Sequence, residues 1–140
     1  MPYFTRRALM LGTVAVTAGL ASRAKAASAE HREFIEAAFR MRDEAVRAGD
    51  QAYGAVMVKD GRIIGFGPSR VVLKNDFTAH AEREAIREAQ ARLGSRDLSG
   101  CILYSSSRPC SQCEAAAADA NIARMIFGRG ATDAGPPRKL

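Results

Sequence analysis

The spacing of apolar residues predicts one helix followed by a β-hairpin in the first half of the chain. From Ser28 to Gly49 apolar residues recur every three or four positions, as on a helix with one buried face. Ser28 is a suitable N-cap for this helix and Gly49 a suitable stop. Two apolar runs, A-V-M-V-K and R-I-I-G-F, then flank Asp60-Gly61, a dipeptide typical of tight hairpin turns. The apolar face of the helix consists of Phe34, Ile35, Ala38, Phe39, Ala45 and Val46.

The second half alternates helices with strands. The segment 67–77 contains Pro, Ser and Asn-Asp and predicts a loop, after which Thr78 is a suitable N-cap for a helix that ends at Gly94. Strands over C-I-L-Y-S and I-A-R-M-I-F flank another helix, expected from about Ser111 to Ala120. Strands joined by crossover helices run parallel. We therefore expect an α/β fold, a three-layer α/β/α sandwich around a mixed sheet of about four to five strands.

The N-terminal segment has the three parts of a cleavable export signal. A basic T-R-R opening precedes a thirteen-residue apolar stretch from Ala8 to Leu20, and an A-x-A site follows at Ala24 to Ala26. The stretch is short for a membrane span, which needs about 20 apolar residues. The Arg6-Arg7 pair resembles the twin-arginine class of signals. We expect residues 1–27 to be a signal peptide that directs the protein to the periplasm, leaving no membrane span in the mature form. An uncleaved anchor or a wrongly assigned translation start are the alternatives.

The net charge of +6 is concentrated in the N-terminal segment and says little about the rest of the chain. Four of the 21 basic residues lie within residues 1–27, which contain no acid, so the remainder has 17 basic against 15 acidic residues. A mature charge of about +2 lacks the strongly basic surface of a nucleic-acid-binding domain. The sequence thus favours a small-molecule partner over nucleic acid.

Cysteine chemistry centres on R-P-C-S-Q-C, residues 108–113. The spacing of Cys110 and Cys113 suits a redox dithiol, a structural disulfide or half of a metal site. An exported protein enters an oxidising compartment, which favours a disulfide. The twin-arginine route, however, carries proteins that are already folded, so a metal could bind the thiolates before they meet an oxidant. Cys101 begins an apolar strand and is expected to be a small buried residue.

A second motif, T-A-H-A-E, favours the metal. His80 and Glu82 lie at the start of the predicted helix, and Cys110 and Cys113 share one face at the start of the next. A helix N-terminus also favours thiolate over thiol. One histidine and two thiolates supply three zinc ligands and leave a fourth position open, which is typical of a catalytic zinc site. Glu82, not needed as a ligand, is then available as the general acid and base.

These motifs resemble the cytidine-deaminase-like superfamily of zinc-dependent deaminases, whose signature is H-x-E with P-C-x-x-C. The segment from Ala52 to about Phe127 is most similar to the branch that holds guanine deaminases and tRNA adenosine deaminases. The carrying residues are Y-G-A-V-M-V-K-D-G at 53–61, N-D-F-T-A-H-A-E at 75–82 and D-L-S-G-C-I-L-Y-S-S-S-R-P-C-S-Q-C at 97–113.

The resemblance implies a hydrolytic deaminase acting on C–N bonds of cyclic amidines. It assigns Zn²⁺ to His80, Cys110 and Cys113 and proton transfer to Glu82. It implies substrate contacts from the Ala81 backbone amide and from Asn75, with a ring-stacking wall near Tyr53 or Phe77. Guanine is the first substrate expected, as a free nucleobase or nucleoside. Cytosine or a pterin, or a zinc-containing binding module without turnover, are alternatives. Relatives of this kind also imply a homodimer.

Three features depart from that branch. Ser69 stands where an asparagine commonly contacts the substrate, Phe77 replaces a proline, and Arg108 replaces a glutamate before Pro-Cys. The deaminase domain is expected over residues 28–130. The segment 131–140, rich in Gly and Pro, is expected to be a flexible tail that does not supply the strand and helix with which relatives close the pocket.

Overall fold

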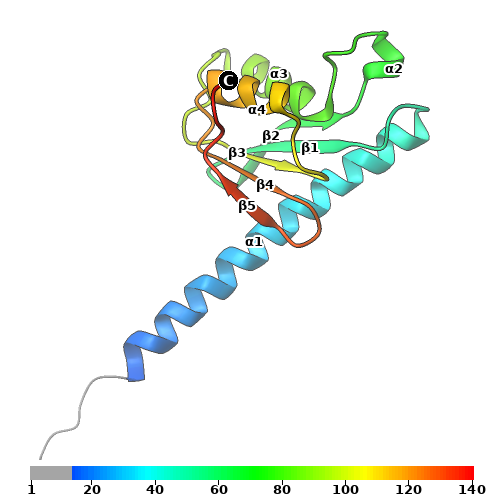
Figure 1. Ribbon diagram of the computed structural model, residues 1–140. Helices are drawn as coiled ribbons and strands as arrows, with labels where there is room; N and C mark the ends of the chain where they lie inside the picture. The colour runs from blue at the N-terminus through cyan, green and yellow to red at the C-terminus, as the bar shows by residue number, and fades with distance from the viewer. Residues whose placement is uncertain (1–13) are drawn as a thin grey trace, which may run out of the picture.

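The computed structural model describes residues 14–140, which form one five-stranded sheet with helices on both faces (Figure 1). The strands are β1 (Gly54–Lys59), β2 (Arg62–Pro68), β3 (Ile102–Ser105), β4 (Arg124–Phe127) and β5 (Thr132–Gly135). The helices are α1 (Val14–Arg47), α2 (Val71–Lys74), α3 (Ala81–Leu93) and α4 (Ser111–Asp119). The strand order is β2-β1-β3-β4-β5. β3 and β4 are parallel and joined through α4, whereas the other neighbours are antiparallel, so the predicted mixed sheet is confirmed.

Two apolar layers sandwich the sheet. Successive side chains of a strand point to opposite faces, so Met57 and Leu103 pack against α3 and α4, while Val56 and Tyr104 pack against α1. In Figure 1, α1 lies along one face and α3 with α4 covers the other. This arrangement confirms the three-layer sandwich and explains why the strands are almost continuously apolar.

The hairpin between β1 and β2 turns at Asp60 and Gly61, with φ values of 49° and 74°. Positive φ at both central positions is the geometry of a type I′ turn, which matches the right-handed twist of the two strands. The sequence-based prediction of a hairpin at Asp60-Gly61 is confirmed.

Three predicted boundaries differ from the structure. α1 runs without interruption from Val14 through Ser28, because this alanine-rich stretch has high helix propensity, so Ser28 is not a helix start. Val46, predicted on the buried face of that helix, is 54% exposed. The loop expected over 67–77 is interrupted by the short helix α2.

The predicted flexible tail also contains regular structure. β5 pairs with β4, and Arg138 donates to the Glu114 carboxylate with its backbone amide and its Nε, both at 3.0 Å. These interactions hold the segment 132–138 against β4 and α4 despite its Gly and Pro content.

The predicted signal peptide lies in part outside the described residues. Residues 1–13, with the twin-arginine pair and the first part of the apolar stretch, fall outside them, and the cleavage near Ala27 stays a prediction. Within residues 14–140, none of the helices combines the length and apolar character needed to cross a membrane.

Candidate metal centre and its cavity

His80 is positioned as the N-cap of α3. Its backbone is extended, with φ −62° and ψ 152°, and its side chain makes no capping hydrogen bond. Thr78, predicted as the N-cap, instead forms a turn in which its amide and hydroxyl donate to Asp76 at 2.8 and 2.7 Å. The Asp76 carboxylate thus closes a turn just before α3, and the helix begins at Ala81 with His80 as its cap.

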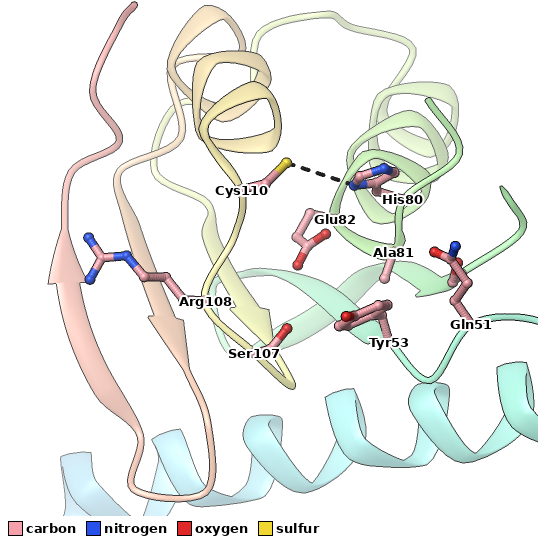
Figure 2. A pocket seen from close by; sticks show the side chains of 9 residues that line it. Gln51, Tyr53, His80, Ala81, Glu82, Ser107, Arg108 and Cys110 are labelled. Carbon is pink, nitrogen blue, oxygen red and sulfur yellow. Dashed lines mark hydrogen bonds between the residues drawn. The ribbon is translucent and has the colours of Figure 1, made fainter. Parts of the chain in front are cut away.

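Cys110 is the N-cap of α4, and its Sγ accepts a hydrogen bond from the Cys113 amide at 3.4 Å. The two sulfurs are 3.3 Å apart. His80 Nδ1 lies 3.8 Å from Cys110 Sγ and 3.5 Å from Cys113 Sγ, and Figure 2 shows the former pair joined across the top of the cavity. The two helix starts therefore converge on one point, as the sequence predicted.

These three side chains fit a zinc ion. A tetrahedral zinc with bonds of about 2.3 Å to sulfur and about 2.0–2.1 Å to nitrogen spreads its ligand atoms roughly 3.6–3.8 Å apart. The ligand atoms of His80, Cys110 and Cys113 all lie within 4.8 Å of one another, and both cysteines are free thiols. Neither a disulfide nor a redox dithiol explains why a histidine nitrogen lies beside both sulfurs. The arrangement is that of a three-ligand zinc site with an open fourth position.

Glu82 lies beside this group in the first turn of α3 and is only 6% exposed. Burial raises the pKa of Glu82, and this outweighs the opposing influence of its own backbone amide, the Cys113 thiol and His80. Burial, reinforced by the neighbouring Glu82 charge, also raises the pKa of the Cys113 thiol in the metal-free chain. The carboxyl of Glu82 is thus poised to hold a proton next to the metal ligands.

A cavity of about 600 Å³ opens in front of these residues (Figure 2). Two of the predicted substrate contacts, Tyr53 and Ala81, are on its wall. The complete lining is Gln51, Tyr53, Ser69, His80, Ala81, Glu82, Ser107, Arg108 and Cys110. Gln51 and Ser107 were not singled out from the sequence, although their proximity to Tyr53 and to the P-C-x-x-C motif was a usable signal.

The other two predicted substrate contacts do not line the cavity. Asn75 is the left-handed C-cap of α2, with φ 48°, and Phe77 is 86% exposed. Ser69 does line the cavity but is 1% exposed, and its hydroxyl donates to Asp50 Oδ1 at 3.0 Å. The structure therefore places the Ser69 hydroxyl in an internal hydrogen bond.

The start of α3 packs directly on β2 at Gly67. A Cβ at this position would fall on the carbonyl oxygen of Ala81 and close to the Ala85 amide, so a glycine is required for the close approach. This contact sets how far His80 and Glu82 reach over the end of the sheet.

Comparisons with known proteins agree with this geometry. The model of the cytidine and deoxycytidylate deaminase zinc-binding region matches residues 28–129. Guanine deaminase of Bacillus subtilis is 43% identical over 105 residues, which is 74% of this chain and 67% of that protein. The tRNA-specific adenosine deaminase of Aquifex aeolicus is 39% identical over 94 residues, 67% of this chain and 62% of that protein. The chain thus spans about two thirds of the length of these relatives.

Solved structures give the same picture. The X-ray structure of the Bacillus subtilis guanine deaminase superposes with a TM-score of 0.66 at 43% identity, covering 70% of this chain and 62% of that one. A structure from studies of A-to-I editing by tRNA:A34 deaminases superposes with a TM-score of 0.67 at 40% identity, covering 69% and 70%. With the family match, the shared fold and the converging His80, Cys110 and Cys113, this chain belongs to the family defined by the zinc-binding region of cytidine and deoxycytidylate deaminases.

Proposed function

We propose that this protein is a zinc-dependent hydrolytic deaminase of a free nucleobase or nucleoside, with guanine as the first candidate substrate. The observation that carries the proposal is the convergence of His80, Cys110 and Cys113 beside the buried Glu82 at the base of an open cavity. Guanine deaminase and tRNA-specific adenosine deaminases are among the relatives that the chain matches.

The residues of the cavity have distinct roles in such a reaction. Zinc, when held by His80, Cys110 and Cys113, supplies a Lewis acid that lowers the pKa of water to about 7. Glu82 would accept one proton from the attacking water and pass it to the ring nitrogen. It would then pass the second proton of that water to the amine, which leaves as ammonia. The carbon–nitrogen bond to the amine breaks as a carbon–oxygen bond forms, so the amidine becomes a lactam.

The start of α3 contributes a second group. Ala81 is the first residue of the helix, where the backbone amide has no partner within the helix. Ala81 lines the cavity between His80 and Glu82, so this amide is available to donate to a polar atom of the substrate. We assign ring stacking to Tyr53, which lines the same cavity and is 47% exposed.

The choice of substrate is open between two classes supported by the relatives. Guanine is favoured because the Bacillus subtilis guanine deaminase aligns at 43% identity over 105 residues. Adenosine in tRNA is the second candidate, since the tRNA-specific adenosine deaminases are nearly as similar. These relatives make nucleic acid a candidate substrate, against the expectation from the sequence, which rested on the low net charge and on the expected export.

The proposal is tested by following ammonia release from a panel of guanine, adenine, cytosine, a pterin, their nucleosides and a tRNA anticodon stem–loop. We expect the protein to release ammonia from one class of substrate. Glu82→Gln is expected to lose this activity and to keep its zinc, because Glu82 is not a ligand. Glu88→Gln, at a partly exposed carboxylate of α3 outside the cavity lining, is the matched control. Zinc-loaded protein that releases no ammonia from any member contradicts the proposal and favours a binding module.

We further propose that the protein is exported to the periplasm after folding and that it forms a homodimer. The basic opening, apolar stretch and A-x-A site of residues 1–27 support export. N-terminal sequencing of periplasmic protein is expected to give a start near Ala27, and light scattering is expected to give twice the mass of the chain. A cytoplasmic protein that keeps Met1, or a monomer, contradicts the respective proposal.

A further inference from the structure

The cavity contains more polar side chains than the proposed reaction uses. His80 and Cys110 are occupied as metal ligands and Glu82 by proton transfer. The guanidinium of Arg108 points away from the cavity, with its Cζ 5.7 Å from the centre of the Phe127 ring (Figure 2). Three lining groups therefore remain for the heterocycle: the hydroxyls of Tyr53 and Ser107 and the carboxamide of Gln51.

Ser69 is not available for this purpose, because Asp50 engages it. The Asp50 carboxylate accepts hydrogen bonds from the Ser69 hydroxyl at 3.0 Å and from the amides of Val72 and Leu73 at 3.0 and 2.9 Å. A hydroxyl has a single proton to donate, and here it is directed at the carboxylate. Ser69 therefore cannot donate to a substrate without breaking this bond.

Gln51 is held firmly while its carboxamide is free. Its backbone amide donates to Asp50 Oδ1 at 2.8 Å, and its carbonyl accepts from the Tyr53 amide at 2.8 Å. Within residues 14–140 its side chain makes no hydrogen bond, and Gln51 lines the cavity together with Tyr53 and Ala81 (Figure 2). The backbone of Gln51 is thus fixed at the rim of the cavity, and its exposed carboxamide is available to a ligand that enters.

We propose that Gln51 is a specificity-determining residue, whose carboxamide binds an edge of the heterocycle that carries a hydrogen-bond donor next to an acceptor. A carboxamide offers one acceptor and two donors in a plane, so it pairs with a lactam edge or with a ring nitrogen beside an N–H. Tyr53, two residues later on the same wall, is placed to stack on the ring held in this way.

This inference rests on the proposed function for the kind of ligand, but its test does not need turnover. The full zinc-loaded chain is used in a Glu82→Gln background, so that a bound base is not deaminated during the measurement. It is dialysed to equilibrium against guanine, adenine and cytosine, and against N-methylated derivatives of the base that binds most tightly. Gln51→Met keeps the side-chain length and removes the hydrogen bonds. Gln90→Met, on α3 outside the cavity lining, is the matched control.

We expect Gln51→Met to weaken binding of the preferred base by about tenfold or more, because the polar edge of the base then loses its hydrogen bonds to the carboxamide. Zinc content stays unchanged, and Gln90→Met binds like the wild type. One methylated derivative binds worse than its parent in the wild type but equally well in Gln51→Met, which a merely structural effect does not produce. The inference is overturned if Gln51→Met binds the preferred base as tightly as the wild type and distinguishes it from the methylated derivatives equally well. It is also overturned if neither protein binds any base. Binding of a base from which the protein with Glu82 releases no ammonia overturns only the proposed activity.

Discussion

Glu84 is a buried carboxylate shared by three cationic side chains, and its replacement by glutamine is predicted to destabilise the protein. Glu84 Oε2 lies 3.1 Å from Arg70 and 2.7 Å from Lys74, and Oε1 lies 2.8 Å from Arg87. Arg70 is the N-cap of α2 and Lys74 its last residue, whereas Glu84 and Arg87 belong to α3. The carboxylate thus ties the segment before His80 to the helix that His80 begins.

The expected loss in the free energy of unfolding follows from how deeply Glu84 and its three partners are buried. The side chain of Glu84 is 3% exposed, whereas Arg70, Lys74 and Arg87 are 38%, 48% and 45% exposed. Breaking a fully buried ion pair costs about 3–5 kcal/mol, and an exposed one about 0–1 kcal/mol. Because the cations left behind can turn to solvent, we expect Glu84→Gln to lower the free energy of unfolding by roughly 1–3 kcal/mol. In a chain of this length that corresponds to a fall in Tm of roughly 3–10 °C.

The loss of stability in Glu84→Gln is expected to depend on pH. Although burial raises the pKa of Glu84, the hydrogen bonds from Lys74, Arg70 and Arg87 outweigh it and hold the pKa below the ordinary value of 4.5. A carboxylate with a depressed pKa stabilises the fold fully above its unfolded pKa, and this stabilisation is lost as the pH falls through the folded pKa. The difference between the wild type and Glu84→Gln is therefore full at pH 7 and shrinks below about pH 4.5.

Thermal unfolding of the zinc-loaded proteins, followed by circular dichroism from pH 3.5 to pH 8, measures this difference. Glu88→Gln is the matched control, since Glu88 makes one ion pair, to Arg92 on the next turn of α3, and that pair is half-exposed. The control is expected to change the free energy of unfolding by less than about 0.5 kcal/mol. Equal Tm values for the two variants, or a loss in Glu84→Gln that does not vary with pH, would refute the reasoning.

Two further substitutions test the packing around the sheet. Gly67→Ala places a Cβ against the Ala81 carbonyl, and we expect it to lower the free energy of unfolding by about 1–3 kcal/mol and to weaken zinc binding. In Gly130→Ala, the control, the new Cβ meets nothing closer than Thr132 Oγ1 at 4.0 Å. We expect this control to behave like the wild type in chemical denaturation and in zinc titration. Tyr104→Phe removes the 2.7 Å hydrogen bond between the buried hydroxyl and His31 Nδ1, and is expected to cost about 1 kcal/mol in urea unfolding. An unchanged midpoint in Gly67→Ala, or in Tyr104→Phe, would contradict the corresponding contact.

Much of the fold was predictable because local rules act strongly in this chain. The Asp60-Gly61 turn needs positive φ at both positions, and the two apolar runs beside it can pair only as a hairpin. The ligand group was predictable for a similar reason, because His80 and Cys110 each precede a helix. β2 and β3 are both antiparallel to β1 and run in the same direction, so α3 and α4 begin at the same end of the sheet. A tertiary contact was not needed to place either motif.

Other features depend on contacts that the sequence does not display. Thr78 is as good an N-cap as His80 on local grounds, but the Asp76 carboxylate captures both its amide and its hydroxyl. β5 has weak strand character, and it forms because β4 offers it an open edge. Likewise, only the structure shows that Asp50 engages Ser69 and leaves the carboxamide of Gln51 facing the cavity.

The measurement that tests the metal centre most directly is zinc content per chain by mass spectrometry of protein purified under reducing conditions. We predict about one zinc per chain in the wild type and in Glu82→Gln, and loss of most of it in His80→Ala and Cys113→Ser. Cys101→Ser, at a buried cysteine outside the ligand group, is expected to keep its zinc. A wild type without zinc, or a Cys113→Ser variant that retains a full equivalent, would contradict the assignment of His80, Cys110 and Cys113 as the ligands.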